Sequence, residues 1–215
     1  MSIIVIGGHT RSVGKTSVVA GLIAALPTHH WTAIKITEHR HGVRSAHGET
    51  CDCATADHSW AISEEKDRSG ESDTSRFLFA GAEHSWWVRT QPGRLADAMP
   101  RIRTILASAQ NAIIESNSIL HFLKPDLYLT VLDPQTADFK ASAQTYLDRA
   151  DAVLLHSVAN SNDPAWEQVS LQPVIDRPTF TIRPPNYVTP ELVEFVRARL
   201  ASLPESSRDR TSLSS

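Results

Sequence analysis

The chain lacks the features that mark secreted, membrane-spanning and nucleic-acid-binding proteins. It has only two cysteines, Cys51 and Cys53, and their separation by one residue excludes a disulfide framework of the secreted type. No apolar run approaches the ~18 residues that cross a bilayer, so we expect no membrane segment. A net charge of -3 has no basic excess, so we expect no nucleic-acid partner. No basic segment precedes the first apolar run, which argues against a signal peptide, and we expect a cytoplasmic protein.

The composition is typical of one globular domain. The 215 residues are 41% hydrophobic and 21% charged, which is enough to bury a substantial core. We expect a single domain over residues 1–203, interrupted by a long insertion over residues 38–72 that is rich in His, Gly, Ser and charge. The Ser- and Arg-rich residues 204–215 are expected to be a disordered tail.

One stretch carries a phosphate-binding pattern. Residues 7–17 read GGHTRSVGKTS, after an apolar run over 3–6 and before an apolar segment over 18–26. Strand, glycine-rich loop and helix in this order are the setting of a P-loop, in which backbone N–H groups and a helix N-terminus bind phosphate. The alternative is an ordinary strand-to-helix turn that carries a lysine. The residues expected to bind nucleotide are Gly8, His9, Thr10, Arg11, Ser12, Val13, Gly14, Lys15, Thr16 and Ser17.

Apolar runs with period two alternate with runs of helical period along the chain. This alternation predicts an α/β fold of three layers, a mostly parallel sheet with helices on both faces, as in P-loop NTPases. Strands are predicted over 3–6, 31–37, 60–62, 84–90, 111–115, 125–133, 151–157 and 179–182, and helices over 14–26, 73–83, 93–109, 138–149, 165–171 and 190–203.

Two charged residues are placed at the ends of predicted strands, where ligands of such sheets bind. Lys35 near the end of the strand over 31–37 is either an edge-strand lysine or aimed at an anion. Glu115 ends the strand over 111–115 and is a candidate Mg²⁺ carboxylate together with the Thr16 hydroxyl, although a helix-capping role is the alternative. Lys15, Lys35 and Glu115 are therefore the candidate catalytic residues.

The loop resembles that of the dethiobiotin synthetase group, because five residues separate Gly8 and Gly14 and the loop ends in Val-Gly-Lys-Thr. Residues 73–76, DTSR, followed by AGA at 80–82, resemble a helix of the MobB family, the GTP-binding accessory proteins of molybdopterin guanine dinucleotide synthesis. Residues 34–41 resemble the Ile-Lys-His-x-His-His stretch of the same family, and the likeness covers roughly residues 1–120. The strand that ends at Glu115 departs from the family's Val-Glu-Gly, because Ser116 replaces the glycine.

The resemblance implies a nucleoside triphosphatase that uses Mg²⁺ and GTP or ATP, a cofactor-biosynthesis enzyme as partner, and a homodimer. It also implies that Lys35 faces phosphate or substrate, and that Asn160, after the strand over 151–157, contacts the purine. A dethiobiotin synthetase-like ligase that uses ATP, a metal-handling NTPase and a non-catalytic nucleotide switch are the alternatives. No guanine-specifying Asn-Lys-x-Asp is present, so the base stays open.

The insertion contains both cysteines and several histidines. Thiolate and imidazole are ligands that Zn²⁺ prefers, so Cys51, Cys53 and His58 are candidate ligands of zinc or of an iron-containing centre. A spacing of one residue is tighter than that of usual zinc sites, and one interpretation is a metal shared across a dimer axis. The competing interpretation is a polar loop with reduced thiols.

Overall fold

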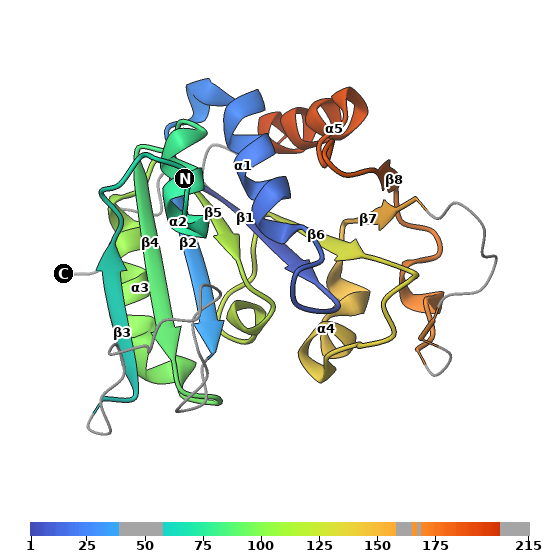
Figure 1. The fold of residues 1–215 in the computed structure, drawn as a ribbon, viewed down its shortest axis with the longest axis horizontal. Helices are drawn as coiled ribbons and strands as arrows, with labels where there is room; N and C mark the ends of the chain where they lie inside the picture. Colours follow the sequence, from blue (N-terminus) through green and yellow to red (C-terminus); the bar gives the residue numbers. More distant parts are fainter. Residues whose placement is uncertain (39–57, 158–164, 167–168, 203–215) are drawn as a thin grey trace.

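The computed structural model describes residues 1–38, 58–157, 165–166 and 169–202. Its described strands form one sheet in the order β3-β4-β2-β5-β1-β6-β7-β8 (Figure 1). All neighbouring pairs are parallel except β3 and β4 at one edge, which are antiparallel. The strands are β1 (Ser2–Gly8), β2 (Trp31–Glu38), β3 (Trp60–Glu64), β4 (His84–Thr90), β5 (Asn111–Glu115), β6 (Leu127–Leu132), β7 (Ala152–His156) and β8 (Thr179–Ile182).

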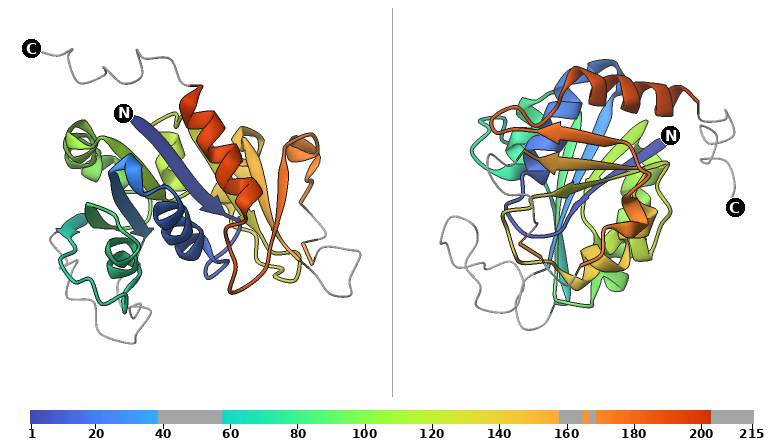
Figure 2. Two further views of the ribbon diagram at one scale, coloured as in Figure 1. Left: turned by 90° about the horizontal axis from the view of Figure 1, so that it is seen from above. Right: turned by 90° about the vertical axis from the view of Figure 1, so that its right-hand side faces the viewer.

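Helices cover both faces of this sheet. The α-helices are α1 (Lys15–Ala25), α2 (Asp73–Phe79), α3 (Leu95–Ser108), α4 (Ala141–Thr145) and α5 (Pro190–Ala201). Short 3-10 helices are η1 (Pro27–His29), η2 (Ser118–His121), η3 (Leu147–Arg149) and η4 (Gln172–Val174). Figure 1 shows α1, α2 and α5 in front of the sheet and α3 behind it, and the two further views in Figure 2 show α5 lying along its face. No helix in the described ranges is long and apolar enough to cross a membrane.

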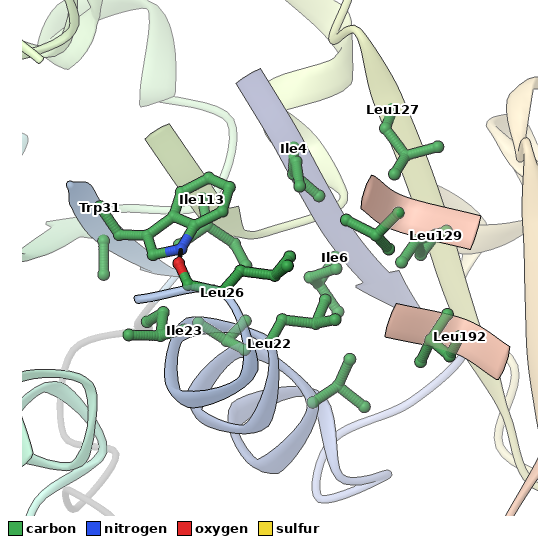
Figure 3. Close-up of a cluster of buried hydrophobic side chains, with 14 of the residues drawn as sticks. Ile4, Ile6, Leu22, Ile23, Leu26, Trp31, Ile113, Leu127, Leu129 and Leu192 are labelled. Atoms are coloured by element: carbon green, nitrogen blue, oxygen red, sulfur yellow. Dashed lines mark hydrogen bonds between the residues drawn. The ribbon is translucent and has the colours of Figure 1, made fainter. Parts of the chain in front are cut away.

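Two buried clusters follow from the alternation of side chains along the strands. On one face, Ile4 and Ile6 of β1 pack with α1, α2 and α5, and the indole N–H of Trp31 donates to the Leu26 carbonyl at 2.9 Å (Figure 3). On the other face, Val5 packs with η2 and with the apolar side of α3. Successive residues of β1 therefore serve opposite cores, which explains why the strand is apolar without interruption.

The order in which the chain adds strands to the sheet reverses between β5 and β6. From β1 the chain passes to β2 and β4 on one side, returns to β5 between β2 and β1, and then continues to β6 on the other side. The carboxyl ends of β1, β2 and β5 lie side by side there, and α1 and α2 begin near them. Such a point is where open parallel sheets bind ligands.

Two predicted helices are wrong in whole or in part. The helix predicted over 138–149 is reduced to α4 and η3, because the segment before α4 is tied to the loop after β1: the Lys140 N–H donates to the His9 carbonyl at 2.8 Å. The described residues of the predicted helix over 165–171 are not helical. There the Ala165 N–H donates to the Pro134 carbonyl at 2.8 Å, and Trp166 is buried against His9. Tertiary contacts outweigh a short helical pattern at both places.

Candidate functional site

The loop between β1 and α1 presents several backbone donors that the fold leaves unused. In the described part of the chain, the turn at residues 11–12 engages the Val13 N–H, and no hydrogen bond is found from the other backbone N–H groups of residues 10–17. Gly14 precedes the first residue of α1 with φ +92°, and Ser12 has φ +57°; these left-handed conformations turn the chain tightly. No side chain caps α1, so its positive end faces the loop. A helix start of this kind binds anions.

The start of the loop is held by Asn117, which follows β5. Its amide oxygen accepts from the Gly8 N–H at 3.0 Å, and its amide nitrogen donates to the Gly8 carbonyl at 2.8 Å. A Cβ atom at Gly7 would lie 2.3 Å from the same amide oxygen, so only glycine allows this approach. Asn117 therefore satisfies both backbone polar groups of Gly8 and fixes the start of the loop.

His9 lies beneath the loop in an aromatic cluster. It is fully buried, its ring centroid lies 4.9 Å from that of Trp166 and 5.3 Å from that of Phe139, and its backbone N–H donates to the Val131 carbonyl at 3.2 Å. Burial lowers the pKa of its imidazole, although hydrogen bonds to the carbonyls of Val131 and Thr136 act in the other direction. His9 thus packs against the core and supports the loop from beneath.

Lys15 folds back over the loop. Its Nζ donates to the Thr10 carbonyl at 2.6 Å, and no carboxylate among the described residues forms an ion pair with it. Burial lowers the pKa of Lys15 to about 8, and the Glu115 carboxylate only partly offsets that effect. A buried ammonium without a bound counter-charge gains the most when an anion arrives.

Four side chains converge at the rim beside the loop. The Thr16 hydroxyl donates to Glu115 Oε2 at 2.8 Å. Lys35 Nζ donates to Glu115 Oε1 at 2.9 Å, to Asp73 Oδ2 at 2.6 Å and to Thr16 Oγ1 at 3.1 Å. The register explains the convergence, because Lys35 and Glu115 are direct partners in β2 and β5 and share the face that α1 and α2 cover.

Lys35 is not an edge-strand lysine. Strand β2 lies between β4 and β5, so that interpretation is wrong, and the side chain of Lys35 is only 13% exposed. Burial alone would lower the pKa of Lys35, but the carboxylates of Glu115 and Asp73 outweigh it and raise the pKa above its ordinary value. Lys35 therefore keeps its charge.

The oxygens around Thr16 fit a hard divalent cation. One hydroxyl and two carboxylates converge on a single cation, the Lys35 ammonium, and oxygen is the ligand atom that Mg²⁺ takes. No group of three His, Cys, Asp or Glu side chains that could hold a metal occurs in the described ranges. His58 is exposed, whereas Cys51, Cys53 and Asn160 lie outside the described residues.

Several site residues have no strong signal in the sequence. The sequence offers Asp73 or Ser72 as the cap of this helix; Ser72 is the N-cap of α2, and the Asp73 carboxylate accepts from Lys35. Arg76 of the same helix donates to Ser17 Oγ at 3.1 Å, and Asp138 Oδ2 accepts from the Thr10 hydroxyl at 2.5 Å. The DTSR stretch was visible as a family pattern, but nothing local indicates that Asp138 reaches the loop.

Comparison with known proteins finds no matching family model and no matching curated sequence. Among solved structures, HypB from Helicobacter pylori, solved in complex with nickel, is 14% identical with a TM-score of 0.47, over 99% of this chain and 90% of HypB. LpxK from Aquifex aeolicus, solved in complex with ATP, is 18% identical with a TM-score of 0.46, over 84% of this chain. The match spans about half of LpxK, 53% of that chain.

The strand order and the helix layers of this molecule confirm the predicted α/β fold class. The chain has a three-layer α/β/α fold around a mostly parallel sheet, with a P-loop between β1 and α1.

Proposed function

We propose that this protein binds ATP or GTP with Mg²⁺ at the loop after β1 and catalyses chemistry at the terminal phosphoryl group. The observation that carries the proposal is the set of backbone N–H groups in residues 10–17 that have no acceptor among the described residues, at an uncapped helix start beside Lys15. Such donors bind oligophosphates because they need no reorganisation when the anion arrives.

Each converging side chain has a role in this proposal. Lys15, whose Nζ now bonds to the Thr10 carbonyl, exchanges that carbonyl for phosphate oxygens and neutralises their charge. Thr16 and Glu115 would hold Mg²⁺, which supplies charge stabilisation to the transferred group when bound. Lys35 would then contact the phosphate while it remains near Asp73. Phosphoryl transfer needs mainly positioning and charge stabilisation, and these groups supply both.

An accessory role of the MobB kind in molybdopterin guanine dinucleotide synthesis is the finer proposal. Its support is the position of the DTSR stretch: Asp73 pairs with Lys35, and Arg76 bonds to Ser17 in the first turn of α1. A cofactor-biosynthesis enzyme as partner, and a homodimer, belong to this proposal. An ATP-dependent ligase with a carboxylate substrate would use the same groups. ATP turnover that requires a small carboxylic acid, and no partner protein, would favour the ligase.

A metal-handling role rests on Cys51 and Cys53, outside the described residues. Its test is the metal content of the purified protein. Stoichiometric Zn or Fe that disappears in a Cys51→Ser, Cys53→Ser variant would support it, and a metal-free wild type would count against it.

The test of nucleotide binding is thermal unfolding with Mg²⁺ and ATP, GTP, ADP or GDP. A triphosphate at ~100 times its dissociation constant should stabilise the wild type by roughly 2.7 kcal/mol, and Lys15→Met should abolish the effect. At equal concentrations, the triphosphate that stabilises the protein more is the one that binds more tightly. If no nucleotide raises the midpoint of the wild type, the proposal fails.

A second arm tests the Mg²⁺ site. The readout is the Mg²⁺ concentration needed for half-maximal triphosphate binding. Glu115→Gln should raise this concentration by about 10- to 100-fold, because it removes the negative charge beside Thr16. Glu83→Gln is the matched control, since the Glu83 carboxylate is hydrogen-bonded to His30, away from the loop. Equal Mg²⁺ dependence in the two variants would exclude Glu115 from the metal site.

A further inference from the structure

The cation Arg89 lies near the end of β4. Among the described residues, no carboxylate forms an ion pair with Arg89, in contrast to Lys35 with its two carboxylates. Arg89 Nη2 donates to Ser63 Oγ at 3.2 Å, while its Nε is buried and has no acceptor in the part of the chain that the structure describes. Burial lowers the pKa of Arg89, which means that the protein disfavours this charge as it stands. A buried donor without a partner costs free energy unless a ligand supplies the acceptor.

The sheet places Arg89 on the same rim and face as the phosphate site. Arg89 is in register with Thr37 of β2, two residues beyond Lys35. Partners in parallel strands project to the same face, so Arg89 shares the face of Lys35 and Glu115. Strand spacing and rise put the Cα atoms of Lys35 and Arg89 roughly 8 Å apart. The Arg89 guanidinium bonds to Ser63 of β3, on the side of β4 away from β2, so a substrate that contacts both side chains has to reach across β4.

The guanidinium is held in a fixed orientation. Its Cζ lies 4.5 Å from the centroid of the Trp87 ring, and the Trp87 indole N–H donates to Thr37 Oγ1 at 2.9 Å. Stacking on the ring holds the plane of the guanidinium, so its N–H groups point sideways rather than toward the ring. A fixed guanidinium fork matches two oxygens of a carboxylate or a phosphate.

We propose that Arg89, held by Trp87 and Ser63, binds the oxyanion of a small acidic second substrate, either a carboxylate or a phosphate group. This inference rests on the proposed function, because it places the substrate beside the terminal phosphoryl group near Lys35. The substrate class is therefore a small organic acid or phosphate ester whose reacting group lies toward Lys35 and whose acidic end lies on Arg89.

The experiment uses full-length protein with its P-loop filled by Mg²⁺ and a non-hydrolysable triphosphate analogue. Inorganic phosphate and acetate are the two probes, and the readout is the ¹H–¹⁵N resonance of the Trp87 indole together with that of Arg89 Nε–H. At least one probe should shift both resonances saturably. The probe that binds more tightly distinguishes a phosphate-bearing from a carboxylate-bearing substrate.

Variants separate the subsite from general charge effects. Arg89→Gln should weaken probe binding about ten-fold or more, read on the Trp87 indole, because it removes a charge-assisted pair of hydrogen bonds. Arg89→Lys should give an intermediate loss, since it keeps the charge without the fork. Arg101→Gln is the matched control: Arg101 lies over Trp86 at 5.7 Å, on the opposite face of β4, and its loss should leave probe binding unchanged.

The inference is overturned if Arg89→Gln binds the probes as the wild type does, or if neither probe shifts the Trp87 indole. Equal losses in Arg89→Gln and Arg101→Gln would also overturn it. Failure of the proposed function is seen separately, as absence of triphosphate binding to the wild type. In that case the same titration on nucleotide-free Lys15→Met protein, whose loop lacks its main cation, still tests Arg89 alone.

Discussion

Two lysines whose side chains lie at the loop after β1 have opposite charge environments. Lys15 is buried with a carbonyl as its hydrogen-bond partner, and its pKa falls to about 8. Lys35 is also buried, but Glu115 and Asp73 bond to it and its pKa rises. The identity of the residue does not set its protonation; the neighbouring charges do. Lys15 is therefore the cation with charge to offer to a ligand.

The lowered pKa of Lys15 predicts a specific pH dependence of stability. Since about 8 in the folded state lies below the ordinary 10.5, the unfolded chain binds more protons between these values, and stability from this group rises with pH across that window. Below this window the buried charge of Lys15 destabilises the folded state, and Lys15→Met removes that cost. The variant should be more stable than the wild type by on the order of 2 kcal/mol at pH 7, and this advantage should vanish by about pH 10.

Urea unfolding of the nucleotide-free proteins at several pH values measures this difference. Lys124→Met serves as the control, because Lys124 is exposed and its loss should produce no pH-dependent difference. A Lys15→Met advantage that is constant from pH 7 to pH 10 would show that Lys15 is not the titrating group.

At the scale of elements, the start of α1 is shaped by a residue far along the chain. Gly14 has φ +92°, and a Cβ atom there would lie 2.2 Å from a ring carbon of Tyr187, which precedes α5. The ring of Tyr187 in turn packs against His156, whose Nε2 lies 2.9 Å from the Val13 carbonyl. The loop is thus closed from the β7–β8 side of the sheet as well as by its own sequence.

Gly14→Ala should therefore destabilise the protein and abolish triphosphate binding. The left-handed backbone costs an alanine roughly 1–2 kcal/mol, and the overlap with Tyr187 adds to that cost. Gly81→Ala is the matched control, because Gly81 also has a left-handed φ, +107°, but a Cβ there has nothing within 4 Å. That variant should show the backbone cost alone and bind triphosphate normally.

Urea unfolding with and without Mg²⁺ and triphosphate compares the two variants. Adding Tyr187→Ala to Gly14→Ala should recover only the part of the lost unfolding free energy that comes from the overlap with the Tyr187 ring. Normal triphosphate binding by Gly14→Ala would refute the close approach of Tyr187 as a constraint on the loop.

At the scale of the whole molecule, both clusters share one sheet. Leu22 of α1 is fully buried on one face, and Ile102 of α3 is fully buried on the other. Because β1 contributes residues to both clusters, neither face can lose its packing without disturbing the other. The described structure therefore predicts one cooperative unit.

Leu22→Ala and Ile102→Ala should each lower the free energy of unfolding by about 2–5 kcal/mol. In both variants, tryptophan fluorescence and far-ultraviolet circular dichroism should report the same single transition. Each should also bind triphosphate with near-normal affinity below its midpoint, since Leu22 and Ile102 lie in helices after the loop and supply no polar group to it. Two separated transitions in either variant would show that the faces unfold independently.

The sequence by itself determined the local features of this protein. Glycine spacing and the Gly-Lys-Thr ending place a P-loop between a strand and a helix, because those residues act through the backbone of their own segment. Alternating apolar runs place Lys35 and Glu115 at strand ends, and the sheet then brings them into register. The pattern fails over 138–149, where bonds to His9 and Thr10 replace helix.

Only the tertiary structure decided which residues complete the site. Asp73 meets Lys35 across 38 positions, Asn117 meets Gly8 across 109, and Asp138 meets Thr10 across 128. The same sheet order puts Arg89 in register with Thr37, two residues beyond Lys35, and among the described residues no carboxylate pairs with Arg89. These pairings depend on which strands are neighbours, and strand order follows from burying two apolar faces at once, a condition on the whole chain that no local pattern contains.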